Sequence, residues 1–298
     1  MKYSLFSVSY AGLWGQQQLS LFDFVTKAKA LGYDGVEIMC KRPHLYPHDV
    51  GDDEAAALAR HVEDAGLEVA CMAAYTNFCA GAESREVPLL DLQVSYVRAI
   101  CRLAARLECG LVRIFTGYEN GREPFARQWE MCVRGIRACC DAAAEFGVTV
   151  GVQNHHDIGV DTDALLELAR EVDRPNLGLM ADAWSMFLRG EDVAASLRKV
   201  GEKMAFSTVA DYVVLPRHRY RPDLVNYEPV QPAFVKAVPM GEGTLDYGRY
   251  FTALREIGYD GWVSYETCSP LRDGGSVETI DEYGAAFLRY MATVPPAP

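Results

Sequence analysis

The 298-residue chain lacks several features that would each indicate a particular class of protein. No apolar run approaches the roughly 18 residues of a membrane span, and the first residues lack the continuous apolar core of a signal peptide. The 9 cysteines form no CxxC pair and no zinc-like spacing with histidine. Basic residues are in deficit, because 29 Lys and Arg face 41 Asp and Glu, for a formal charge of −12. We therefore expect a reduced, cytoplasmic protein that binds neither membranes nor nucleic acids.

What the sequence does contain is a regular alternation of short apolar runs and amphipathic stretches. Each of eight strand-like runs is followed by a stretch with helical periodicity. The expected strands are Tyr3–Tyr10, Asp34–Met39, Leu67–Ala74, Leu111–Phe115, Val148–Asn154, Asn176–Asp182, Met204–Val209 and Trp262–Thr267. No stretch between them has the composition of a linker, and no GxGxxG follows the first strand. The pattern predicts an α/β protein whose residues 1–298 form a single (β/α)8 TIM barrel domain.

Polar residues cluster at the ends of these strands, where such barrels place their active sites. Because strand side chains alternate between two faces, Gln153, Asp182 and Glu266 should point toward the barrel axis. The same alternation turns Arg113 and Glu37 inward, where we expect them to bind substrate. Grouped oxygen donors suit a hard divalent cation such as Mn²⁺ or Mg²⁺. We therefore predict a metal site formed by Gln153, Asp182 and Glu266.

Histidines and two long loops supply further candidates for contact with a substrate. By strand parity His155 shares the inward face with the predicted ligands, and His156 follows it directly. The loop candidates are His44 and His48 after the second strand, and Arg217 and Arg219 after the seventh. The second of these loops is basic and aromatic, and we expect it to lie over the mouth of the barrel.

Besides the strand that ends at Asp182, four motifs of the chain are informative. They are GYDGVEI (Gly32–Ile38), VRIFTG (Val112–Gly117), VQNHHD (Val152–Asp157) and VPMGEGTLDYGRYFTALREIGYDGWVSYE (Val238–Glu266). On these residues the whole chain resembles the xylose isomerase-like TIM barrel family, which includes sugar isomerases and epimerases, inosose-processing enzymes and endonuclease IV. The resemblance implies a barrel, a sugar-like substrate and one bound divalent metal ion.

The resemblance also shows where this chain departs from the family. The usual ligands, Glu, Asp, His and Glu at the ends of strands five to eight, correspond here to Gln153, Asp182, Thr208 and Glu266. Two of the four positions are therefore changed. Gln153 cannot exchange a proton, which disfavours a symmetrical shuttle between two carboxylates. Glu266 is then expected to be the catalytic base, with His155 or His156 as its partner, and strand parity favours His155.

Three hypotheses about function follow from these assignments. The first is a sugar isomerase or epimerase that acts on a small keto-sugar or cyclitol through a metal-stabilised enediolate, with Glu266 as base. The second is a lyase or dehydratase that eliminates water from a keto-sugar or an inosose-type substrate. The third is a sugar-binding protein without catalytic activity. In each case the expected ligand is a small polyhydroxylated molecule. The chain could also form a homo-oligomer.

Overall fold

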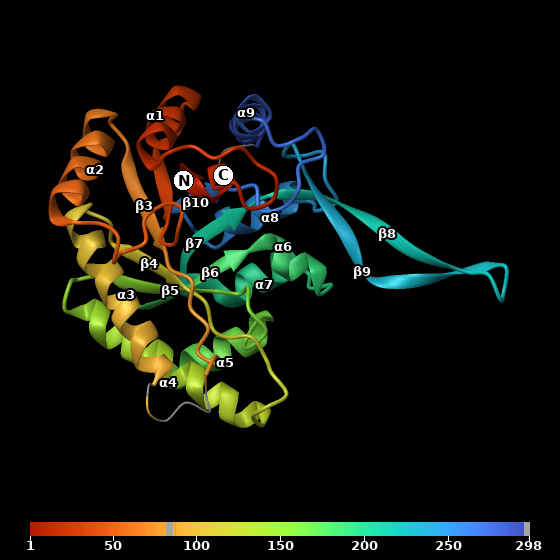
Figure 1. Cartoon of the computed structure of the whole chain (residues 1–298), viewed down its shortest axis with the longest axis horizontal. Helices are drawn as coiled ribbons and strands as arrows, with labels where there is room; N and C mark the ends of the chain where they lie inside the picture. Colours follow the sequence, from red (N-terminus) through yellow and green to blue (C-terminus); the bar gives the residue numbers. More distant parts are fainter. Residues whose placement is uncertain (82–85, 87, 295–298) are drawn as a thin grey trace.

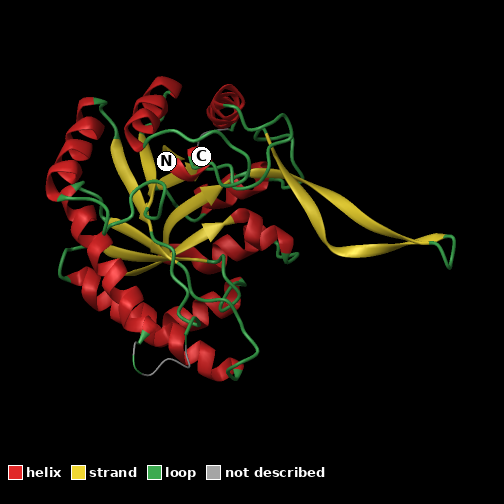
Figure 2. Ribbon diagram, in the orientation of Figure 1, coloured by secondary structure: helices red, strands yellow, loops and turns green. Residues whose placement is uncertain are grey.

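The computed structural model describes residues 1–81, 86 and 88–294 and confirms the (β/α)8 barrel. Among these residues a closed parallel barrel forms in the strand order β1-β10-β7-β6-β5-β4-β3-β2 (Figures 1 and 2). Its strands are β1 (Lys2–Phe6), β2 (Gly35–Met39), β3 (Glu68–Ala73), β4 (Leu111–Ile114), β5 (Thr149–Gln153), β6 (Leu177–Asp182), β7 (Met204–Val209) and β10 (Trp262–Tyr265). The expected first strand is shorter than predicted, because the chain turns into a 3-10 helix over Ser7–Tyr10.

Helices cover the outside of the barrel, and the alternation of strand residues explains how they attach. Val112, Val150 and Val263 point outward and are buried in the layer beneath the helices. Met180 and Phe206 point inward and fill the floor of the barrel. The helices are α1 (Leu21–Leu31), α2 (Asp52–Asp64), α3 (Leu89–Arg106), α4 (Phe125–Ala144), α5 (Thr162–Val172), α6 (Ala183–Leu188), α7 (Val193–Val200), α8 (Tyr247–Glu256) and α9 (Val277–Thr293).

The largest departure from the predicted pattern follows β7. The stretch expected to be a loop over the mouth is instead an antiparallel hairpin of β8 (Asp211–Arg221) and β9 (Asn226–Val238), which projects away from the barrel (Figure 1). Pro216, Pro229 and Pro232 argue against strands in the sequence, because proline cannot donate to a ladder. A two-stranded ribbon tolerates these prolines because each of its strands has a free edge. The register of the ribbon shifts beside Pro216. We call residues 211–238 the arm.

The structure bears on two further features of the sequence, its apolar segments and its cysteines. No helix in the described part of the chain has the length and hydropathy needed to cross a bilayer. All nine cysteines are free thiols, and all but Cys268 are buried, as expected for small core residues. That residues 1–298 act as one domain stays a prediction.

Candidate active site

Neighbouring strands bring Gln153 and Asp182 into contact at the mouth of the barrel. Gln153 ends β5, and its Nε2 donates to Oδ2 of Asp182 at 3.4 Å. Nη1 of Arg113 donates to Oε1 of Gln153 at 2.8 Å. Because a guanidinium only donates and a carboxylate only accepts, the Gln153 amide can satisfy both neighbours in one orientation only. The three side chains therefore form a directed hydrogen-bond chain from the cation to the anion.

Asp182 is also the N-cap of the short helix α6, a role that the sequence prediction missed. Its Oδ1 accepts the backbone N–H groups of Trp184 at 3.0 Å and of Ser185 at 3.3 Å. Its Oδ2 accepts the Ser185 hydroxyl at 2.8 Å, in addition to the amide of Gln153. Four donors thus surround the carboxylate, which fixes its position and satisfies two of the orphan N–H groups of the helix.

Glu266 lies immediately after β10 and is the half-buried carboxylate of the mouth. Its backbone N–H donates to the carbonyl of Val209 at 3.0 Å, which holds the residue at the barrel rim. The thiol of Cys268 donates to its Oε2 at 2.8 Å. The pKa of Glu266 is raised to about 8. Desolvation is the larger cause, and the negative charge of Asp182 adds to it. A carboxylate with such a pKa is poised to take up or release a proton near neutral pH.

A buried positive charge lies beneath these carboxylates. Arg113 projects inward from β4 with its guanidinium 4.1 Å from the ring centroid of Phe115 and 4.8 Å from that of Tyr75. Glu37, on β2, is fully buried, and among the described residues neither of its carboxylate oxygens has a hydrogen-bond partner. Burial raises the pKa of Glu37 to about 7, against the opposing effect of the Arg113 charge. Arg113 thus balances the charge of Glu37 while it orients Gln153.

The two histidines after β5 have different surroundings. His155 is an exposed residue whose ring lies 4.7 Å from that of Phe115. Partial desolvation of the ring by its neighbours lowers the pKa of His155. The negative charge of Asp182 opposes this shift. His156 is buried between Phe115 and Tyr118, at ring distances of 4.2 and 4.0 Å. Burial and the charge of His155 lower the pKa of His156 to about 3. His155 therefore keeps access to a substrate, whereas His156 packs as a neutral ring.

The remaining predicted substrate contacts lie apart from the Gln153–Asp182 pair. His44 is held by Ser7 and by the carbonyl of Leu19, at 3.1 and 3.3 Å from its ring nitrogens. His48 is exposed in the same loop. Arg217 and Arg219 are exposed on β8 of the arm. Their roles in substrate binding stay predictions.

Two side chains at the mouth were not among the predicted site residues. Lys41 lies with Nζ 3.9 Å from the ring centroid of Tyr75, whose ring also contacts Arg113. Cys268 donates to Glu266, and desolvation of its thiol, together with the neighbouring Glu266 carboxylate, raises the thiol pKa well above the usual value, which keeps the donor protonated. The strand parity that selected Glu266 also applies two residues later, so the sequence did carry a signal for Cys268.

The donor set does not fit a divalent metal ion. The oxygen of Gln153 is occupied by Arg113, and its NH₂ group is turned toward Asp182. Thr208 stands at the position of the family histidine, and in the described part of the chain no three His, Cys, Asp or Glu side chains are grouped to hold a metal. A cation in this place would compete with four hydrogen bonds to Asp182 and face the Arg113 charge. The mechanism proposed below therefore uses the side chains of the protein alone.

Restoring both family ligands should raise the affinity of the chain for a divalent metal ion. We expect Gln153→Glu combined with Thr208→His to bind Mn²⁺ at least about 100-fold more tightly than the unmodified protein, because both changes add ligands that favour divalent ions. Titration of free Mn²⁺ by electron paramagnetic resonance measures this directly. Thr208→His alone is the matched control and should bind weakly. Micromolar, stoichiometric Mn²⁺ binding by the unmodified protein would contradict the assignment.

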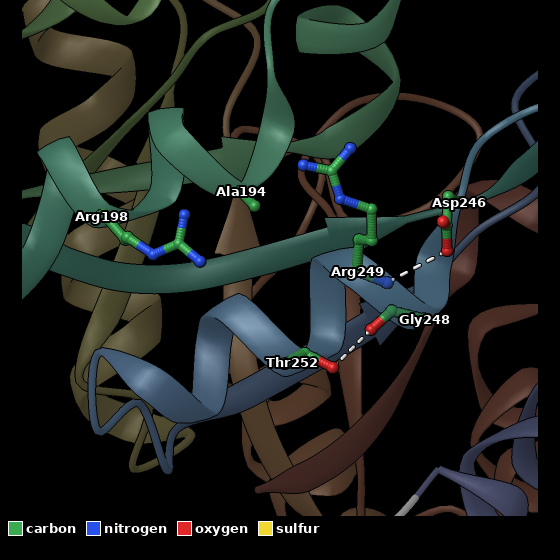
Figure 3. Close-up of a pocket in the computed structure, with 6 residues that line it drawn as sticks. All are labelled: Ala194, Arg198, Asp246, Gly248, Arg249 and Thr252. Atoms are coloured by element: carbon green, nitrogen blue, oxygen red, sulfur yellow. Dashed lines mark hydrogen bonds between the residues drawn. The ribbon is translucent and has the colours of Figure 1, made fainter.

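A separate hollow of about 400 Å³ lies on the outer wall, where α7 and α8 meet (Figure 3). It is lined by Ala194, Arg198, Asp246, Gly248, Arg249 and Thr252. Its two arginines are already engaged, Arg198 by Glu256 at 2.6 Å and Arg249 by Asp192 at 3.1 Å. These pairs leave no uncompensated charge for an anionic ligand, and we assign the hollow no function.

Comparisons with known proteins agree with this architecture. A model of the xylose isomerase-like TIM barrel family matches residues 25–291. A 3-dehydroshikimate dehydratase of Bacillus anthracis is 23% identical over 265 residues, which cover 86% of this chain and 88% of that protein. An inosose dehydratase of Geobacillus thermodenitrificans (strain NG80-2) is 26% identical over 140 residues, so the match spans about half of each protein, 47%.

Among solved structures, D-psicose 3-epimerase with D-tagatose from Clostridium cellulolyticum H10 has a TM-score of 0.76. The superposition covers 99% of both chains at 16% sequence identity, and at that identity it supports the fold alone. The family match extends over most of the chain and includes β2 to β10, on which the residues of the mouth are carried. The chain therefore belongs to the xylose isomerase-like TIM barrel family.

Proposed function

We propose that this protein is a cytoplasmic enzyme that isomerises or epimerises a small keto-sugar or cyclitol. The observation that carries the proposal is the half-buried carboxylate of Glu266, whose pKa is about 8, at a mouth that also holds a buried cation. Such a base removes a proton from the carbon next to a carbonyl. The electron pair of the C–H bond then moves to the carbonyl oxygen and gives an enediolate.

The hydrogen-bond chain beneath the mouth accounts for stabilisation of that negative charge. Arg113 places a positive charge in a region with little water, where electrostatic interactions are strong. Gln153 passes no proton, so Glu266 is the single carboxylate base. Return of the proton by Glu266 to the adjacent carbon on the same face, with transfer of the hydroxyl proton to the former carbonyl oxygen, completes an isomerisation. An epimerisation requires a donor on the opposite face, for which His155 is the candidate.

A dehydratase is the second candidate function. Two observations favour it: the similar proteins named dehydratases, and the exposed His155, which follows β5 and lies against Phe115. In this reaction Glu266 removes the same proton, and the intermediate expels a hydroxyl group at the next carbon. His155 would protonate the hydroxyl as it leaves, so that water and an unsaturated ketone are the products.

Hydrogen exchange in D₂O tests the proposal and separates the two candidates. We expect solvent deuterium to enter the carbon next to the carbonyl of at least one member of a panel of ketohexoses and inososes, with no loss of water. Nuclear magnetic resonance and mass spectrometry of the recovered sugar give the position and the mass. Loss of water would favour the dehydratase. Sugar binding without any exchange would contradict both and favour the non-catalytic hypothesis.

A further inference from the structure

Lys41 carries a positive charge at the mouth that has no acidic partner. It lies two residues after the end of β2, and its side chain is only partly exposed. Its Nζ lies 3.9 Å from the ring centroid of Tyr75. Lys2, Lys27 and Lys199 are each paired with a carboxylate. In contrast, no carboxylate of the described residues forms an ion pair with Lys41.

A second cation contacts the same aromatic ring. The guanidinium of Arg113 lies 4.8 Å from the ring centroid of Tyr75. Two like charges on one ring repel each other where little water is present to screen them. Desolvation, and to a lesser extent the charge of Arg113, lowers the pKa of Lys41. An anion beside Lys41 would therefore stabilise its ammonium group.

The carboxylates around the mouth are engaged by other groups. Asp182 is surrounded by four hydrogen-bond donors. Glu37 is fully buried beneath the mouth, where the charge of Arg113 opposes its own. Oε2 of Glu266 accepts the Cys268 thiol. The described residues thus leave the ammonium of Lys41 as an uncompensated cation at the mouth of a chain whose formal charge is −12.

The position of Lys41 indicates which part of a substrate would meet it. Strands β2 and β10 flank β1 in the barrel, so Lys41 and Glu266 follow strands on the two sides of β1. Tyr75, which Lys41 contacts, and Cys268, which donates to Glu266, pack against the same small apolar cluster. A ketone that presents its acidic carbon to Glu266 therefore directs another part of its carbon chain toward Lys41.

We propose that Lys41 binds a carboxylate group of the substrate, so that the site selects a keto acid derived from a sugar or cyclitol over a neutral ketone. This inference deepens the proposed function and rests on it for the ketone. A carboxylate is favoured over a phosphate because one ammonium matches a single negative charge. The second cation that a phosphate would require, Arg113, is buried and donates to Gln153.

Calorimetric titration with a matched pair of ketones tests the proposal. 5-Keto-D-gluconate and L-sorbose differ only in a carboxylate that replaces a CH₂OH group. We expect the acid to bind at least about 10-fold more tightly near pH 7, because hydrogen bonds to charged groups are the strong ones. This preference should fall as NaCl is raised from about 50 to 500 mM. Lys41→Met should abolish the preference without changing the affinity for L-sorbose, and Lys41→Arg should retain it.

Lys203→Met is the matched control. It removes the same charge from an exposed lysine that immediately precedes β7, at the opposite end of the barrel from the mouth. This variant should keep the preference for the acid. Thermal melting checks that each variant is folded, and Lys41→Gln replaces Lys41→Met if the latter misfolds.

The possible outcomes separate this inference from the proposed function, because calorimetry measures binding without turnover. An acid that binds no more tightly than L-sorbose, or a preference that survives in folded Lys41→Met, would overturn the inference. Tighter binding of L-sorbose 6-phosphate that depends on Lys41 would overturn the choice of a carboxylate. Deuterium exchange without a preference for the acid contradicts the inference alone, whereas the preference without any exchange contradicts the proposed reaction alone.

Discussion

Replacement of Glu266 by Gln should reduce kcat by at least about 10²-fold while KM changes little, because general-base catalysis contributes about 10²–10⁴ and, among the described residues, no other carboxylate is both at the mouth and free of hydrogen-bond donors. Gln153, at the end of β5, cannot accept the proton, and Asp182 is engaged by four hydrogen-bond donors. The measurement is steady-state turnover of the keto-sugar or inosose that shows exchange in D₂O. A variant with more than a tenth of the original kcat would contradict the role of Glu266.

Two controls distinguish loss of the base from general damage. Glu242→Gln changes an exposed glutamate of the GEG turn and should leave turnover unchanged. The pH profile gives the second control. Because the base must be ionised, kcat/KM of the unmodified enzyme should rise with pH through a midpoint near 8, the pKa of Glu266. The residual activity of Glu266→Gln should lack that rise.

Arg113→Met should lower the free energy of unfolding by about 3–5 kcal/mol near pH 8, because it leaves the buried Glu37 carboxylate without a compensating cation. It should also reduce kcat by at least about 10²-fold, because the enediolate loses the buried positive charge beneath the mouth. Urea denaturation gives the stability, and the same turnover assay gives the rate.

The stability loss should depend on pH in a direction set by Glu37. The folded-state pKa of this residue is already raised to about 7 and rises further without Arg113. At pH 5 Glu37 is therefore protonated in the folded protein, and the substitution should cost less than at pH 8. Glu37→Gln combined with Arg113→Met should recover part of the lost stability. Equal costs at both pH values, or no recovery in the double variant, would contradict the charge pairing.

The residues of the mouth could be predicted because strand parity depends only on sequence order. Arg113, Gln153, Asp182 and Glu266 were expected on the inward face of the barrel, and the structure places outward neighbours such as Val112 in the layer beneath the helices. The hydrogen-bond partners could not be predicted in the same way. The orientation of the Gln153 amide depends on both Arg113 and Asp182, which lie on different strands.

The arm and α6 were missed for different physical reasons. The prolines of the arm suggest a loop, and only a ribbon with two free edges accommodates them as strands. Helix α6 spans only six residues, too few for a periodic pattern, and it begins at a carboxylate that we interpreted as a metal ligand. In both cases the deciding contacts involve backbone groups that residue types do not specify.

The cap that Asp182 provides to α6 has a consequence for how this protein can evolve. A lineage that regained an ion at the mouth would have to change Gln153 and Thr208 and also draw the aspartate away from its helix, at a cost of about 0.5–2 kcal/mol. The step at position 153 loses the hydrogen bonds of Gln153 to Arg113 and Asp182 before an ion is held. A return to glutamate at position 153 alone is therefore opposed, and ancestral sequence reconstruction should not find glutamate at 153 together with threonine at 208.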